Sequence, residues 1–113
     1  METLIRSHHK VLYNLGSIER IPPGEGRTFR VEHILVSVFR TRGGAVLATQ
    51  SDCPHTGEAL ADGIVSGEKV ICPLHSYKFD LRTGNPIDNT CEALKTYAVS
   101  LNACGDILLD LEG

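Results

Sequence analysis

Residues 53–75 read CPHTGEALADGIVSGEKVICPLH, and this stretch carries the most specific pattern in the 113-residue chain. It begins with Cys53-Pro54-His55 and ends with Cys72-Pro73-Leu74-His75, so each end supplies one thiol and one imidazole. Each pair also adjoins residues that are common in turns, Thr56-Gly57 after the first pair and Ser76 after the second. The spacing therefore predicts two loops, each carrying one cysteine and one histidine.

Three interpretations of these two pairs compete. In the first they are ordinary buried cysteines and core histidines, although two such pairs in a chain with five histidines argue against coincidence. In the second they form a structural zinc site of the Cys₂His₂ type. Zinc sites usually hold each ligand pair on a Cys-x₂₋₄-Cys or His-x₃₋₅-His knuckle, whereas both pairs here are mixed. In the third they form a [2Fe–2S] centre in which two histidines replace two cysteines on one iron. One cysteine and one histidine from each of two loops would supply that ligand set.

A family resemblance supports the third interpretation. The two pairs are followed by Tyr77-Lys78-Phe79-Asp80-Leu81 and by Thr83-Gly84. Together these motifs resemble the Rieske iron–sulfur domain, and the likeness extends over residues 11–111. It implies an all-β fold, an antiparallel β-sandwich of the Rieske (ISP-domain) type, in which the cluster-binding loops, about residues 52–80, form a small subdomain.

The resemblance also assigns the ligands of one [2Fe–2S] cluster per chain. It implies that Cys53 and Cys72 bind the inner iron, and that His55 and His75 bind the outer iron, nearer to solvent. In the family a third, proline-rich loop lies over the cluster, and residues 85–87 occupy the corresponding place in the sequence.

The residues around the second pair predict a low reduction potential. High-potential Rieske proteins of respiratory complexes carry an extra cysteine in each loop, and both loops here lack one. Those proteins also place a serine and a tyrosine two and four residues after the second histidine, where this chain has Tyr77 and Phe79. Phenylalanine cannot donate a hydrogen bond to a cluster sulfur. Fewer donors stabilise the reduced state less, so we expect a low-potential cluster.

The pattern outside the cysteine–histidine stretch independently predicts an all-β chain. Short β-branched runs alternate with turn residues, Gly43-Gly44 is typical of a hairpin turn, and no long window has helical periodicity. Residues 34–40 are nearly all apolar, which indicates a strand buried on both faces. The strands expected from the pattern are residues 10–15, 28–32, 34–40, 45–49, 97–101 and 107–111.

Composition limits the kinds of protein that this chain can be. With 42% hydrophobic residues and a net charge of −3, it can fold as a single domain over residues 1–113 rather than remain disordered. The small acidic surplus argues against a nucleic-acid partner. A sequence without a long apolar run or a signal-peptide pattern predicts a soluble, cytoplasmic protein without a membrane partner. Cytosolic thiols stay reduced, so metal or redox chemistry is the better expectation for the cysteines.

These features predict an electron-transfer protein without an active site of its own. It would pass electrons between an NAD(P)H-linked reductase and a large catalytic oxidoreductase subunit. Residues 21–26, 38–42, 53–57 and 94–97 resemble the small subunit of an assimilatory NAD(P)H-dependent nitrite reductase, whose large subunit carries sirohaem. The alternative is a Rieske ferredoxin that delivers electrons to an aromatic-ring dioxygenase. A more distant alternative is a zinc-bound or metal-free scaffold subunit.

The remaining cysteines and acidic residues receive simpler interpretations. Cys91 and Cys104 have no histidine beside them in the sequence and are expected to be structural or incidental. Four acidic residues flank the predicted loops. They are either ordinary solvated charges or a rim that steers a basic partner. These residues are Asp52, Glu58, Asp62 and Asp80.

Overall fold

The computed structural model describes residues 3–7, 10–54, 57–73 and 77–111. Within these residues the regular structure is strands and two single-turn 3₁₀ helices, which confirms the all-β prediction. No helix among the described residues is long and apolar enough to cross a membrane. The elements are β1 (Thr3–Ser7), β2 (Lys10–Ser17), η1 (Ile18–Arg20), β3 (Glu25–Val31), β4 (Ile34–Arg40), β5 (Val46–Gln50), η2 (Leu60–Asp62), β6 (Ile64–Ser66), β7 (Lys69–Ile71), β8 (Lys78–Asp80), β9 (Pro86–Ile87), β10 (Thr96–Leu101) and β11 (Asp106–Asp110).

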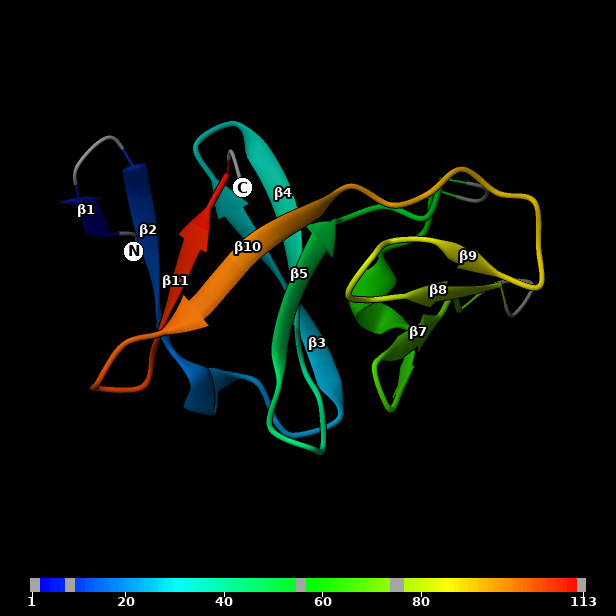
Figure 1. Ribbon diagram of the computed structural model, residues 1–113, viewed down its shortest axis with the longest axis horizontal. Helices are drawn as coiled ribbons and strands as arrows, with labels where there is room; N and C mark the ends of the chain where they lie inside the picture. Colours follow the sequence, from blue (N-terminus) through cyan, green and yellow to red (C-terminus); the bar gives the residue numbers. More distant parts are fainter. Residues whose placement is uncertain (1–2, 8–9, 55–56, 74–76, 112–113) are drawn as a thin grey trace.

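The strands form two antiparallel sheets of different size. The larger sheet has the order β1-β2-β11-β10-β5-β4-β3, and the smaller has the order β6-β7-β8-β9. Figure 1 shows the large sheet curling through the left and centre of the molecule, with the small sheet beyond β5 at the right. The small sheet is therefore an insertion between β5 and β10, two strands that pair with each other in the large sheet.

The large sheet packs its apolar side chains into one core. Residues from β2, β3, β4, β5, β10 and β11 contribute to it, although β2 and β3 lie far apart in the strand order. The buried members of this first core are Leu15, Ile18, Ile21, Val31, Val36, Val38, Ala48, Tyr97, Ile107 and Leu109.

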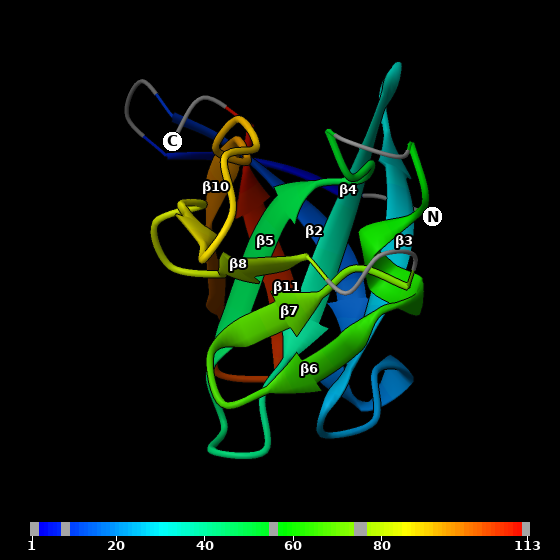
Figure 2. The same ribbon diagram turned by 90° about the vertical axis from the view of Figure 1, so that its right-hand side faces the viewer.

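A second core lies between the large sheet and the small one, whose strands β6, β7 and β8 lie in front of β4 and β5 in Figure 2. Each strand β6, β7 and β8 contributes its single buried residue to it, as three-residue strands in a thin sheet must. Both cysteines of the predicted site belong to it. Its buried members are Phe39, Cys53, Leu60, Val65, Val70, Cys72, Phe79, Leu81 and Leu94.

Strand β4 separates the two cores and serves both. Successive side chains of a strand point to opposite faces, so Val36 and Val38 enter the first core while Phe39 enters the second. Ser37, on the same face as Phe39, is fully buried, and its Oγ donates to the carbonyl of Ser51 at 3.4 Å. This arrangement confirms that residues 36–39 are buried on both faces, whereas Ile34 and Leu35 at the start of the strand are exposed.

Candidate metal centre

Cys53 and Cys72 begin two loops that share one backbone construction. Cys53 lies after β5 and the single bridge of Asp52 with Ala59, and Cys72 directly follows β7. The Cys53 N–H donates to the carbonyl of Glu58 at 2.8 Å, and the Cys72 N–H donates to the carbonyl of Tyr77 at 2.7 Å. In both loops the backbone N–H of the cysteine therefore donates a hydrogen bond to the carbonyl of the residue five positions later. The sequence predicted two loops, and the backbone shows them to be equivalent at the cysteine.

The two cysteine side chains lie in the same apolar environment. Cys53 is 1% exposed and Cys72 is 2% exposed, and both pack in the second core with Phe39 and Phe79. Thiolate ligands of an iron–sulfur cluster need such shielding, because water and dioxygen would otherwise reach the sulfurs. The two buried thiols, offered by equivalent positions of two loops, fit the cysteine half of the expected ligand set.

The histidine half of that set cannot be placed by the structure. His55 and His75 both lie outside the described residues. Among the residues that are described, no group of three or more His, Cys, Asp or Glu side chains gathers as metal ligands do. The assignment of the histidines as ligands therefore stays a prediction.

Close backbone contacts hold the small sheet in place behind the loops. A Cβ atom at Gly63, just before β6, would collide with the carbonyl oxygen of Ile71, the residue that precedes Cys72. Gly84 has a φ of +81°, and a Cβ there would collide with the carbonyl oxygen of Leu94. The Leu94 N–H in turn donates to the Gly84 carbonyl at 2.7 Å. Glycine is required at these positions because backbone occupies the space of a side chain.

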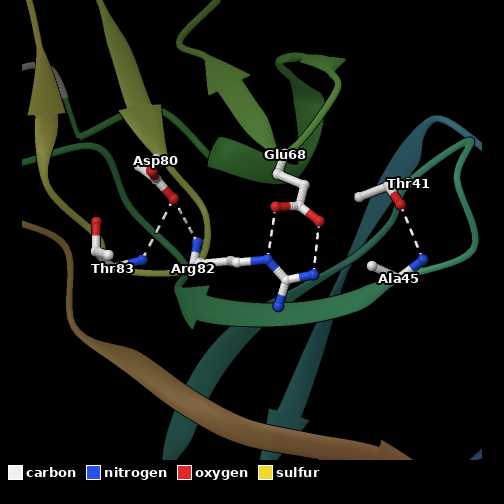
Figure 3. A network of polar contacts seen from close by, with 6 residues as sticks. All are labelled: Thr41, Ala45, Glu68, Asp80, Arg82 and Thr83. Carbon is white, nitrogen blue, oxygen red and sulfur yellow. Dashed lines mark hydrogen bonds and ion pairs between the residues drawn. The ribbon is translucent and has the colours of Figure 1, made fainter.

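An ion pair closes the end of the small sheet opposite the Cys72 loop. The Arg82 guanidinium donates to both carboxylate oxygens of Glu68, from Nε at 2.5 Å and from the second nitrogen at 2.6 Å (Figure 3). The hydrogen bond lowers the pKa of the Glu68 carboxyl below its ordinary 4.5 and raises the pKa of Arg82. The Leu81 N–H also donates to the Glu68 carbonyl at 2.8 Å, so the turns before β7 and after β8 are joined.

The acidic residues near the loops fall into two groups. Asp52, Glu58 and Asp62 are exposed on the segment from β5 to η2. Asp80 is half-buried, and its Oδ1 accepts from the N–H groups of Arg82 at 2.8 Å and Thr83 at 3.4 Å. Figure 3 shows that these bonds shape the turn after β8. Asp80 is thus structural. The other three carboxylates, here called the acidic rim, are exposed, as both interpretations of them require.

Three further expectations for this region concern the covering loop, the residues after the second histidine and the other two cysteines. Residues 86–87 form strand β9, paired with β8, instead of part of a covering loop. Phe79 is fully buried, and Tyr77 is half-buried against the second core. Cys91 is half-buried against the same core, and Cys104 is an exposed free cysteine in the turn before β11.

Sequence reasoning did not single out the side-chain amides of Gln50 and Asn89, which lie beside the two loops. The Gln50 amide donates to the carbonyl of Asp52, next to Cys53, at 2.8 Å. The Asn89 amide donates to the carbonyl of Lys78, next to Tyr77, at 3.1 Å. The sequence did contain one signal for such a role. Gln50 directly follows the strand expected at residues 45–49 and lies just before the first cysteine.

Comparison with known proteins supports the expected family. A model of the Rieske [2Fe–2S] domain matches residues 11–98. The chain is 40% identical over 96 residues to the ferredoxin component of biphenyl 2,3-dioxygenase from Rhodococcus jostii. The matched segment covers 82% of this chain and 86% of that protein. Among solved structures, the ferredoxin of carbazole 1,9a-dioxygenase from Nocardioides aromaticivorans is 29% identical with a TM-score of 0.75, covering 95% and 96%. A putative NADH-dependent nitrite reductase small subunit from Mycobacterium tuberculosis is 22% identical with a TM-score of 0.82, covering 91% and 96%.

Proposed function

The chain belongs to the Rieske [2Fe–2S] family, and we propose that Cys53, His55, Cys72 and His75 are the ligands of its cluster. The family carries a [2Fe–2S] cluster, and the chain is accordingly a Rieske ferredoxin, an electron carrier. The buried cysteines at equivalent positions of two loops support the thiolate half of this ligand set. The histidine half rests on the family pattern and on the spacing of each histidine from its cysteine.

When bound, the cluster accepts and releases one electron. The protein's own residues shield it on the cysteine side, because the second core closes around Cys53 and Cys72. An apolar surrounding disfavours the added charge of the reduced state, and the buried Phe79 has no donor to offset it. We therefore propose that the potential lies in the low part of the Rieske range.

For the partner, we propose the oxygenase component of an aromatic-ring dioxygenase, with an NAD(P)H-linked reductase as the electron source. The single observation that carries this proposal is the 40% identity with a biphenyl dioxygenase ferredoxin component over most of both chains. The sequence motifs alone favoured a nitrite reductase small subunit. At 22% identity the solved nitrite reductase subunit is evidence of a shared fold and not of a shared partner.

The partner proposal is tested by electron transfer between purified proteins. The protein, reduced with dithionite under anaerobic conditions, is mixed by stopped flow with the oxidised oxygenase component of the Rhodococcus jostii biphenyl dioxygenase. That system's own ferredoxin component is the positive control. We expect rapid oxidation, slowed by added salt if the acidic rim meets a basic surface. Oxidation by a sirohaem nitrite reductase large subunit, without oxidation by the oxygenase, would overturn this proposal in favour of the nitrite reductase.

The ligand proposal is tested by exchanging a histidine for a thiolate. His55→Cys or His75→Cys adds one negative charge to the ligand set, so reduction becomes harder. We expect the midpoint potential to move from the Rieske range, roughly −150 to +300 mV, toward the value of about −400 mV typical of plant-type ferredoxins. His33→Cys, in the exposed turn between β3 and β4, is the matched control and leaves the potential unchanged. An unchanged potential in both ligand variants would remove the histidines from the ligand set.

A further inference from the structure

Residues 88–95 connect β9 to β10, and this segment, here called the strap, packs against the core that holds the two cysteines. Figure 1 shows the strap in yellow to orange, passing around the end of the small sheet on its way back to β10. Leu94 of the strap is 4% exposed within the second core, and Cys91 is half-buried against it. The strap contains no regular strand or helix, so its position depends on individual contacts.

At its C-terminal end the strap is held by Gln50. Strands β5 and β10 pair at Thr96 with Thr49 and at Tyr97 with Ala48, and the backbones diverge beyond Gln50. The Gln50 N–H still donates to the Lys95 carbonyl at 2.8 Å, and the Lys95 N–H donates to Oε1 of the Gln50 side chain at 2.8 Å. The side-chain amide thus continues the ladder after the strands have separated.

The same amide also reaches the first cysteine loop. Nε2 of Gln50 donates to the carbonyl of Asp52 at 2.8 Å, and Asp52 directly precedes the buried Cys53. One side chain therefore joins the strap to the start of the Cys53 loop. If the strap moved away from the loop, the Gln50 side chain would lose its bond either to Lys95 or to Asp52.

At its N-terminal end the strap is held by Asn89 in a similar way. Strands β8 and β9 pair at Lys78 with Ile87, and the chain then turns through Asp88, whose φ is +58°. Nδ2 of Asn89 donates to the carbonyls of Lys78 at 3.1 Å and Ile87 at 3.0 Å, while Oδ1 accepts from the Cys91 N–H at 2.9 Å. Lys78 follows Tyr77, whose carbonyl accepts from the Cys72 N–H.

We propose that Gln50 and Asn89 are positioning residues that fasten the strap to the bases of the two cysteine loops and so control water access to the cluster. This inference rests on the proposed ligand set. Two ferric ions and two sulfides carry a charge of 2+, and two thiolates neutralise it, so the reduced cluster carries one negative charge. Water stabilises the charged state more than the neutral one. A loosened strap therefore raises the reduction potential.

The strap's own cysteine provides a readout that does not depend on the partner protein. In the loaded protein Cys53 and Cys72 are taken up as ligands, which leaves Cys91 and the exposed Cys104 to react with iodoacetamide. Labelling of each cysteine is followed by peptide mass spectrometry. Gln50→Ala and Asn89→Ala each remove two or more hydrogen bonds. We expect each to raise the labelling rate of Cys91 relative to Cys104 by about 5- to 30-fold.

A matched control variant lies in the turn between β10 and β11. Oδ1 of Asn102 accepts from the N–H groups of Cys104 and Asp106 at 2.9 Å each, as Oδ1 of Asn89 accepts from the Cys91 N–H. Figure 1 shows this turn at the far side of the large sheet from the small one. Asn102→Ala removes a contact of the Cys104 N–H and so alters the reference cysteine, but it leaves the absolute labelling rate of Cys91 and the potential unchanged.

The proposal requires two results together. Gln50→Ala and Asn89→Ala speed Cys91 labelling, and both raise the midpoint potential measured by EPR-monitored redox titration. Unchanged labelling in both variants would overturn the fastening role. Faster labelling with an unchanged potential would overturn the positioning role and leave a purely structural one.

A further variant covers the case in which Gln50→Ala no longer retains iron. Gln50→Glu keeps the acceptor for the Lys95 N–H but cannot donate to the Asp52 carbonyl. It therefore separates the strap from the Cys53 loop, so Cys91 should be labelled faster than in the wild type, and labelling at the wild-type rate would contradict the proposal. If the wild-type protein itself shows no Rieske signal, the proposed ligand set fails, whereas the labelling result still decides how the strap is held.

Discussion

Replacing Phe39 with alanine is the most informative test of whether the second core supports the site of the two cysteines. Phe39 is fully buried, and its ring lies so close to β3 that a Cβ atom on Gly26 would come within 2.6 Å of it. Its ring packs in the core that contains Cys53 and Cys72. Truncating a fully buried phenylalanine costs about 3–5 kcal/mol, since lost burial and the remaining cavity add together. With a urea m-value of about 2 kcal/mol/M, a loss of about 4 kcal/mol lowers the unfolding midpoint by about 2 M.

The assay for this variant records two signals on the same urea series. Far-UV circular dichroism follows the sheets, and visible absorbance follows the cluster. Phe29→Ala is the matched control, because Phe29 lies on the neighbouring β3 and is only partly buried against the first core, so its loss should cost about 1–2 kcal/mol. We expect Phe39→Ala to lower both midpoints more than Phe29→Ala does. Equal midpoints for the two variants would refute the view that Phe39 supports the site.

Two further predictions concern the small sheet. Arg82 lowers the pKa of Glu68, so the stability difference between the wild type and Glu68→Gln should be full above pH 4.5 and disappear as the pH falls through the lowered folded-state value. Thermal unfolding from pH 7 to pH 2 measures it, and a difference that persists at the acid end would contradict the assignment. Gly84→Ala should lower the melting temperature more than Gly67→Ala. Both glycines have positive φ, which costs about 1–2 kcal/mol for alanine, but only at Gly84 would the new Cβ collide with the carbonyl of Leu94. Equal effects of the two glycine substitutions would show that the close contact is unimportant.

The strands of the large sheet could be predicted because each contains enough residues to show a pattern. Strand β4 was expected at residues 34–40 and is found there, and β10 and β11, separated by residues 102–105, correspond to the strands expected at residues 97–101 and 107–111. The expected strand at 97–101 alternates in sequence, yet Leu101 at its end is exposed. Periodicity identifies a strand but does not reveal where the sheet leaves its core.

The small sheet could not be predicted because its strands are too short. Strands β6, β7 and β8 have three residues each with one buried side chain, which is too few repeats of the two-residue period to identify a strand. They are stable because Val65, Val70 and Phe79 pack against a common core that includes residues distant in sequence. The family resemblance placed residues 85–87 in a covering loop, and the two residues of β9 contain no period that would have indicated a strand.

The cysteines of the site could be recognised from the sequence, but their support could not. A thiol and an imidazole at short spacing, repeated once, indicate ligand chemistry without any knowledge of the fold. The bonds of Gln50 to Lys95 and of Asn89 to Lys78 join residues that are distant in sequence, and side-chain amides occur in many other roles. Such support becomes visible only when the strands that diverge beside each amide are known.

The central claim is that this chain carries one electron on a mixed cysteine–histidine [2Fe–2S] cluster. It is tested most directly by the EPR spectrum of the dithionite-reduced protein, with iron and acid-labile sulfide counted on the same anaerobically purified sample. The account predicts a rhombic signal of the Rieske type with two irons and two sulfides per chain. A sample without iron and without a signal, or one that contains zinc instead, would contradict it.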